Sequence, residues 1–155
     1  MQLEVISQRP NKDAGLSPLL LVHGAWHGAC RWEHFQSYFA KHGYGAYAVN
    51  LRGHGNSDGR DGIRWASAEE YVEDLEQAIS TLPKPPMLIG HSAGGYLVQK
   101  YLGSRPAVAA VLLASISVNG AFKMFNRIAK RHPWKYLRFH CFFDRNNLII
   151  YYCYR

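Results

Sequence analysis

The pentapeptide Gly90-His91-Ser92-Ala93-Gly94 stands between a short apolar run and a segment of helical composition. The run, residues 86–89, is predicted to be a buried strand, and residues 96–102 are predicted to be a helix. A serine on such a sharp turn presents its hydroxyl above the sheet, and small neighbours relieve the crowding of its strained backbone. The helix directs backbone N–H groups at the same point. The segment therefore predicts a nucleophile elbow centred on Ser92, with an ordinary serine helix cap as the alternative.

Apolar runs alternate with amphipathic segments along most of the chain, and a capping box at Ser67–Glu70 opens one of the helical segments. Strands that alternate with helices indicate an α/β fold with a mostly parallel sheet and helices on both faces. In the first helix, Trp32, Phe35 and Phe39 form one apolar stripe. Strands are expected at residues 2–7, 19–22, 46–49, 86–89 and 110–114, of which 19–22 and 110–114 have the continuous apolar character of buried strands, and helices at residues 29–42, from 67 and at 96–102.

At 155 residues, with 48% hydrophobic side chains, the chain has the size of one domain with an ordinary core. Its first residues lack the basic segment and long apolar run of a signal peptide, and no stretch approaches the ~18 apolar residues that a membrane span needs. Its three cysteines show neither an even pairing nor C-x-x-C spacing, which favours reduced thiols in a cytoplasmic protein. The sequence contains no motif for a cofactor, a metal or a phosphate loop.

The net charge of +7 is unevenly distributed along the chain. Residues 1–76 contain ten acidic side chains against seven Lys and Arg, a balance of −3, whereas residues 77–155 contain one acidic side chain against eleven, a balance of +10. A basic half is compatible with binding to nucleic acid or to an anionic membrane surface. No nucleic-acid motif accompanies it, so we interpret the charge as a solvated face and expect no nucleic-acid partner.

A nucleophile elbow requires an oxyanion hole, which normally takes one N–H from the residue after the nucleophile and one from the loop after an earlier central strand. Ala93 follows Ser92, and the loop His23-Gly24-Ala25-Trp26 follows the strand at residues 19–22. Ala93 and either Ala25 or Trp26 are therefore the candidate oxyanion donors. The alternative for residues 23–26 is a plain strand-to-helix turn.

Three segments occur in order: Leu21-Val22-His23-Gly24, then Arg52-Gly53-His54-Gly55-Asn56-Ser57, then the elbow pentapeptide. As a set they resemble the α/β-hydrolase superfamily, and the run His23 to Gly28 followed by Trp32 resembles its branch of small esterases and related lyases. The resemblance implies hydrolysis of a small carboxylic ester or similar acyl substrate. It also implies a core over residues 1–120, and the start of a cap followed by an atypical tail over residues 121–155. Many relatives carry Asp where Asn50 stands.

The same resemblance places a catalytic acid and a catalytic histidine late in the chain, yet no Asp or Glu occurs between Glu76 and Asp144. His140 and Asp144 are the one late His/Asp pair, in the reverse of the family's order. We therefore expect a truncated core that lacks its last strands. Alternatives to an active hydrolase are a catalytically incomplete homologue, a lyase, or a binding module that self-associates through an exposed edge at residues 110–114.

Overall fold

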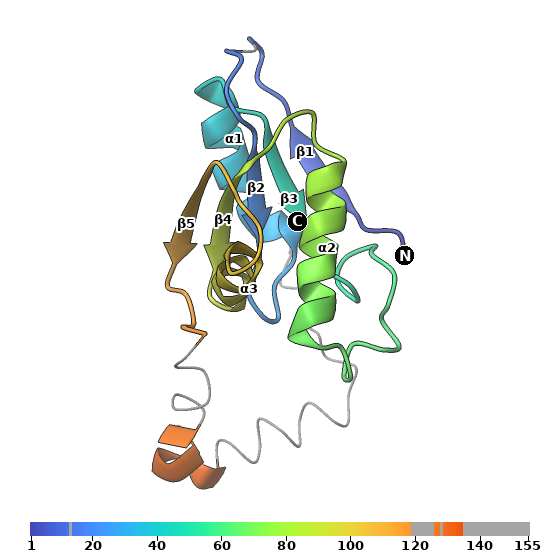
Figure 1. The fold of residues 1–155 in the computed structure, drawn as a ribbon, viewed down its shortest axis with the longest axis vertical. Coiled ribbons are helices and arrows are strands. Elements are labelled where there is room, and N and C mark those ends of the chain that lie inside the picture. Colours follow the sequence, from blue (N-terminus) through green and yellow to red (C-terminus); the bar gives the residue numbers. More distant parts are fainter. Residues whose placement is uncertain (13, 119–125, 128, 135–155) are drawn as a thin grey trace.

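The computed structural model describes residues 1–12, 14–118, 126–127 and 129–134 (Figure 1). Five strands form one sheet in the order β1-β3-β2-β4-β5. β1 runs antiparallel to β3, and all other neighbouring strands are parallel. The elements are β1 (Val5–Gln8), β2 (Leu19–Val22), η1 (Ala29–Trp32), α1 (Glu33–Lys41), β3 (Ala46–Val49), α2 (Ala68–Ser80), β4 (Met87–His91), α3 (Ala93–Leu102) and β5 (Ala109–Leu113).

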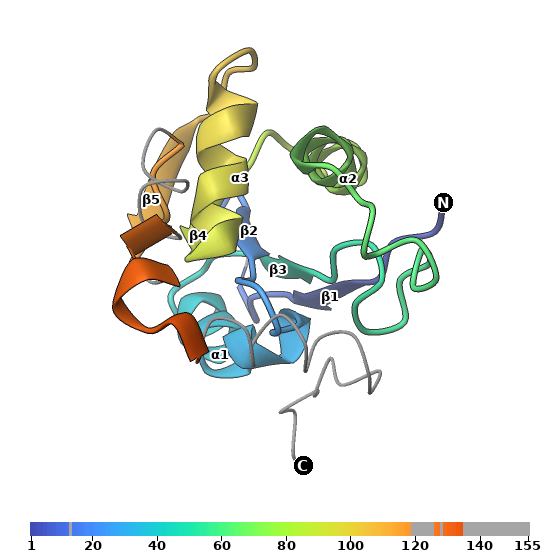
Figure 2. The ribbon, with the colours of Figure 1, turned by 90° about the horizontal axis from the view of Figure 1, so that it is seen from below.

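Helices cover both faces of the sheet, with α1 on one face and α2 and α3 on the other (Figure 2). The predicted α/β fold with a mostly parallel sheet is confirmed. All four residues of β2 are at most 3% exposed, and their side chains alternate between the two layers. Leu20 and Val22 pack with α2 and α3, whereas Leu19 and Leu21 pack on the side of η1 and α1. The central strand is therefore apolar throughout because both of its faces are buried.

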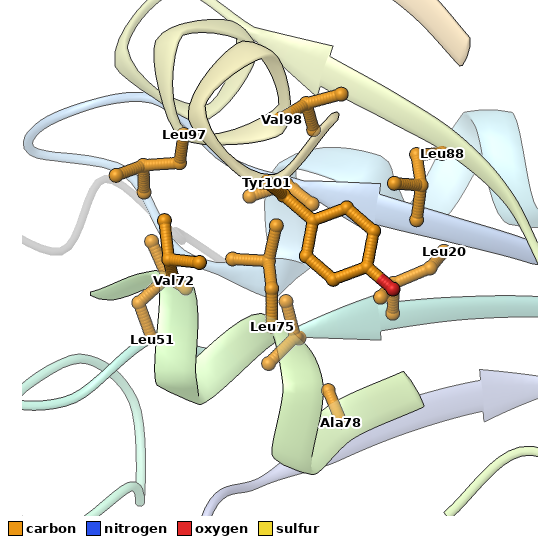
Figure 3. Packing of buried hydrophobic residues seen from close by; sticks show 11 residues of the cluster. Leu20, Leu51, Val72, Leu75, Ala78, Leu88, Leu97, Val98 and Tyr101 are labelled. Carbon is orange, nitrogen blue, oxygen red and sulfur yellow. The ribbon is translucent and has the colours of Figure 1, made fainter. Parts of the chain in front are cut away.

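The larger core lies between the sheet and the helices α2 and α3. Leu75 and Ala78 of α2 meet Val98 of α3 over Leu20 and Leu88 of the sheet (Figure 3). α2 begins at the predicted capping box: the Glu70 N–H donates to Ser67 Oγ at 3.2 Å, and the Ser67 N–H donates to Glu70 Oε2 at 2.8 Å. The cap fixes the start of α2 and with it the register of the face that packs on the sheet.

Several local predictions differ from the structure. The segment predicted as one helix over residues 29–42 divides into η1 and α1, and Phe35 is 45% exposed. β1 begins at Val5 because the preceding residues form hydrogen bonds to the loop at residues 50–58. β5 has the composition of a buried strand, but Val111 and Leu112 are 48% and 43% exposed, as expected for the exposed edge of a sheet without further strands. Among the described residues, β4 is the one strand that pairs with β5, so an apolar composition did not ensure burial.

Cys30 is disulfide-bonded, which contradicts the prediction of three reduced thiols. The predicted cytoplasmic location stays a prediction. Within the described ranges, no helix has the length and hydropathy to cross a membrane. The predicted division into a core over 1–120 and a cap and tail over 121–155 falls largely on residues outside the described ranges, and so do His140 and Asp144.

Candidate active site

Ser92 has the backbone geometry expected of a nucleophile elbow. It lies between the last residue of β4 and the first residue of α3, with φ 52° and ψ −114°. This left-handed conformation is unfavourable for a residue with a side chain and costs about 1–3 kcal/mol. Two glycines make the turn possible: a Cβ on Gly90 would lie 2.6 Å from the Gly94 carbonyl oxygen, and a Cβ on Gly94 would overlap the Val22 carbonyl. The backbones of β4 and α3 therefore approach so closely that positions 90 and 94 have no room for a side chain.

The loop after β2 lies against Ser92. β2 and β4 are neighbouring parallel strands, so their carboxyl ends meet at the same edge of the sheet. A Cβ on Gly24 would lie 3.1 Å from Ser92 Cβ and 3.2 Å from the His91 carbonyl oxygen. The two segments that the sequence singled out are thus brought together at one point, and a side chain at position 24 would require its neighbours to shift by a few tenths of an ångström.

His23 fixes the orientation of this loop. Its Nε2 accepts a hydrogen bond from the Leu51 N–H at 3.2 Å, so Nδ1 carries the proton and donates to the Gly24 carbonyl at 2.8 Å. Burial, together with the neighbouring His54, lowers the pKa of His23 from 6.5 to about 3. The ring therefore stays neutral at physiological pH and keeps this single tautomer.

The Gly24 carbonyl accepts a second hydrogen bond, from the His27 N–H at 3.3 Å. In a trans peptide the N–H points opposite to the carbonyl, so the Ala25 N–H points away from the His23 ring. This N–H has no acceptor among the described residues. The Ala93 N–H, at the start of α3, has none either, as expected for the first turn of a helix. Ala25 and Ala93 thus provide two free donors near Ser92, whereas Trp26, with φ 60°, is 41% exposed.

A buried ion pair holds the glycine-rich loop at residues 52–59 behind His23. The Arg52 N–H donates to Asp74 Oδ2 at 2.9 Å, and the Arg52 guanidinium bonds Asp74 Oδ1 at 2.9 Å. Asp74 is 1% exposed, and its hydrogen bonds raise the pKa of Arg52. Within this loop His54 packs against His23 with ring centroids 4.8 Å apart. A continuous set of contacts therefore links α2 to the loop beside Ser92.

Asn50 stands where the resemblance noted in the sequence implies Asp in many relatives. Its Oδ1 accepts from the Ala29 N–H at 2.8 Å, and its Nδ2 donates to Glu4 Oε2 at 2.6 Å. Glu4 also accepts from Asn56 through the backbone and side chain. Burial alone would raise the pKa of Glu4, but these hydrogen bonds lower it below its usual value. An amide at position 50 is thus matched to a carboxylate at position 4, where a second carboxylate would repel it.

A pocket of about 180 Å³ opens beside Gly24 and His91. A cavity of about 150 Å³ can hold benzene, so this one has room for a small acyl group. Its lining is largely apolar and, in the part of the chain that the structure describes, contains no acidic side chain. Burial, and then the charges of Arg31 and His91, lower the pKa of His27 at its edge. The lining residues are His23, Gly24, His27, Arg31, Trp32, Phe35, His91 and Leu113.

Across the ranges that the structure describes, no hydrogen bond joins the Ser92 hydroxyl to a histidine, and no cluster of His, Cys, Asp and Glu is arranged to hold a metal. The support that Asp74 and His23 give to the loop was not predicted from the sequence. The Arg-Gly-His-Gly motif marked one end of that support, but its partners in α2 and β2 are distant in the sequence.

The chain is similar in sequence to known proteins. Residues 17–143 match the family described as Serine aminopeptidase, S33. A monoacylglycerol lipase of Mycolicibacterium smegmatis is 32% identical over 109 residues, which are 65% of this chain and 38% of the lipase. Methylesterase 3 of Arabidopsis thaliana is 35% identical over 79 residues, which are 50% of this chain and 30% of the relative. The chain therefore spans less than half the length of these relatives.

Solved structures give the same result. A probable hydrolytic enzyme from Pseudomonas aeruginosa superposes with a TM-score of 0.68 at 26% identity, covering 79% of this chain and 39% of that one. The monoacylglycerol lipase of Paleococcus ferrophilus gives a TM-score of 0.61 at 26% identity, covering 86% of this chain and 53% of that one. Both likenesses extend over most of the chain and over only part of the longer protein.

Proposed function

Because the chain belongs to the serine aminopeptidase S33 family of α/β-hydrolases, we propose that it serves the hydrolysis of carboxylic esters or similar acyl bonds, with Ser92 as the nucleophile. The observation that carries the proposal is the strained conformation of Ser92 at the strand-to-helix turn, directly against Gly24. Esterase- and lipase-like relatives support the reaction class. A small ester is the proposed substrate.

The proposed reaction follows from the donors around Ser92. The Ser92 oxygen attacks the ester carbonyl carbon, and the carbonyl electron pair moves onto its oxygen. The Ala25 and Ala93 N–H groups stabilise this oxyanion, with Trp26 as the alternative to Ala25; one such donor contributes about 10²–10³-fold to kcat. Collapse of the intermediate expels the alcohol and leaves an acyl-serine, which water then hydrolyses to the carboxylic acid. A base must accept the serine proton in the first step and return it to the leaving alcohol.

A second candidate follows from the unassigned base. Within the described ranges Ser92 has no histidine partner, which favours a catalytically incomplete homologue that binds esters without turning them over. A serine hydroxyl without a base is a poor nucleophile. The two candidates differ in whether the reactivity of the chain depends on Ser92.

The test uses the full 155-residue chain with p-nitrophenyl acetate and a fluorophosphonate probe. The matched control for Ser92→Ala is Ser104→Ala, which removes an exposed serine beyond the end of α3. An active hydrolase should lose nearly all turnover and labelling in Ser92→Ala, of the order of 10⁶-fold in kcat for a complete triad, and none in Ser104→Ala. Equal, weak activity in all three proteins would establish the incomplete homologue instead.

A further inference from the structure

A second set of hydrogen bonds reaches Ser92 from the side of β5. The Ser92 N–H donates to the Leu113 carbonyl at 2.9 Å, and the Ile116 N–H donates to the Ser92 carbonyl at 3.2 Å. Both peptide groups that flank the Ser92 Cα are therefore tied to the segment at residues 113–116. A residue with an unfavourable backbone conformation keeps it only where its surroundings hold both of its ends.

The segment at residues 113–116 is itself held by one side chain of α3. Gln99 Nε2 donates to Ser115 Oγ at 2.7 Å and to the Ile116 carbonyl at 2.8 Å. The Ser115 hydroxyl also donates to the Ile116 carbonyl at 3.1 Å. Ala114, inside the segment, has φ 45°, a conformation that a residue with a Cβ rarely adopts. The hydrogen bonds of Gln99 therefore hold the segment at residues 113–116 in a backbone conformation that is unfavourable at Ala114.

The helix and this segment are in direct contact at Gly95. A Cβ on Gly95 would lie 2.5 Å from Ser115 Oγ, so any larger residue would displace the segment from the first turn of α3. Gly95 lies just outside the elbow pentapeptide, and Gln99 lies one turn further along the same face of α3. Gly95 and Gln99, on one face of the helix that follows Ser92, thus both contact the segment on the far side of the turn.

We propose that Gln99 is a positioning residue for the nucleophile. Its amide fixes residues 113–116, and these residues fix the peptide groups before and after Ser92. Gln99 touches neither the serine hydroxyl nor the pocket beside Gly24. The inference rests on the proposed function, since the orientation of Ser92 matters for catalysis only if Ser92 reacts. A displacement of about 1 Å at a reacting group lowers a rate by about 10²-fold, so a remote hydrogen bond can control reactivity.

The test replaces Gln99 by Met, which has a similar length and no hydrogen-bond donor. Gln77→Met is the matched control, because Gln77 lies on α2 and its exposed side chain bonds only the Met1 carbonyl among the described residues. Amide hydrogen exchange, followed by NMR in the full chain, needs no catalytic activity. We expect Gln99→Met to speed exchange at Ser92 and Ile116 by about 10-fold or more, with core amides such as that of Leu88 unchanged.

Reactivity provides the second measurement. A fluorophosphonate forms a phosphorus–oxygen bond with Ser92 and loses fluoride together with the serine proton. Gln99→Met should lower the rate constant of this step by about 10–100-fold, while the probe concentration that gives half of the maximal rate stays the same. Gln77→Met should change neither quantity. A purely structural role would instead lower stability and leave the rate constant of the folded protein as it was.

Each outcome decides the inference. Unchanged exchange at Ser92 and Ile116 in Gln99→Met overturns it, as does an equal acceleration at every amide. If Gln99→Met does not fold, Ser115→Ala removes one of the two short hydrogen bonds and should raise exchange at Ser92 above that in Gln77→Met; equality with that control overturns the inference. A Ser92 that reacts in no variant overturns the proposed function, and exchange alone then decides whether Gln99 holds the turn.

Discussion

The loop after β2 and the segment after β5 both touch Ser92, but different interactions hold them. The loop after β2 follows a completely buried strand and is fixed by the neutral ring of His23, behind which the Arg52–Asp74 pair is buried. The segment after β5 follows a strand with exposed side chains and is fixed by backbone hydrogen bonds and one glutamine. The stability of the first side, the loop after β2, therefore depends on charge and pH. The stability of the second side, the segment after β5, depends on what covers β5.

The largest loss of stability is expected at the buried carboxylate of Asp74, which holds the first side. Asp74→Ala leaves the Arg52 guanidinium, 13% exposed, without its buried carboxylate. Breaking a buried pair from one side costs about 3–5 kcal/mol. Because the Arg52 guanidinium keeps its contact with the 44% exposed Glu70, the free energy of unfolding measured in urea should fall by about 3 kcal/mol, the lower end of that range.

Glu73→Ala provides the matched control for this prediction. Glu73 lies 3.7 Å from the same guanidinium but is 67% exposed, so its loss should cost less than about 1 kcal/mol. Equal losses in the two variants would show that the buried pair does not anchor this side of the site.

The second effect is a dependence of the free energy of unfolding on pH, which arises from His23 on the same side. The folded-state pKa of His23, about 3, lies below the unfolded value of 6.5, so folding favours the neutral ring. This contribution is complete above pH 6.5 and is lost progressively as the pH falls towards 3. Between pH 7.5 and pH 5 it should lower the free energy of unfolding by about 2 kcal/mol.

His23→Asn removes this titration, so the pH dependence of its unfolding free energy should be smaller by about that amount. Urea titrations of both proteins at pH 7.5 and pH 5 provide the comparison. Parallel pH profiles for the wild type and His23→Asn would assign the acid sensitivity to other groups. Burial also lowers the pKa of His54, which therefore contributes with the same sign.

The smallest effect on stability is expected on the second side, where the change should appear in association instead. Residues 106–118, which include β5, contain no charged side chain, and charges on an edge strand normally prevent pairing with another chain. We expect the 155-residue chain to self-associate through β5. Leu112→Lys should increase the monomer fraction in sedimentation velocity while changing stability by less than about 0.5 kcal/mol.

Ile6→Lys, on the opposite edge strand β1, is the control for association. Ile6 is 40% exposed, much like Leu112 at 43%, so the two substitutions place a similar charge at the two edges of one sheet. Association that Ile6→Lys abolishes and Leu112→Lys preserves would assign the contact to β1, and a monomeric wild type would contradict the prediction.

The sequence predicted those features whose cause is local. The order of strands and helices follows from periodicity, the start of α2 from the Ser67 cap, and the turn at Ser92 from the glycines around it. The composition of β5 alone indicated a buried strand, because an apolar run has the same composition whether or not another layer covers it; its exposure followed only from the expectation that the sheet lacks further strands. Phe35 belongs to the predicted apolar stripe of the first helix but is exposed, and it lines the pocket beside Gly24.

The side-chain links that hold the site could not be read from spacing. Arg52 and Asp74 are 22 residues apart, and Gln99 and Ser115 are 16 apart. Their contacts depend on how α2 and α3 approach the sheet, which local patterns do not specify. The identity of the oxyanion donors and of Ser92 as the nucleophile remains a prediction that the labelling and turnover experiments test.

The φ of 52° at Ser92 has a consequence for mutational tolerance. Glycine adopts this conformation without the penalty of about 1–3 kcal/mol that a side chain incurs, so the fold itself has no reason to keep serine there. Selection for abundance should rank glycine above serine at position 92, and selection for catalysis should rank serine first. A library of variants could be sorted once for protein abundance and once for catalysis. Position 92 should be where the two rankings of amino acids differ most, which would identify it as a residue kept for chemistry and not for folding.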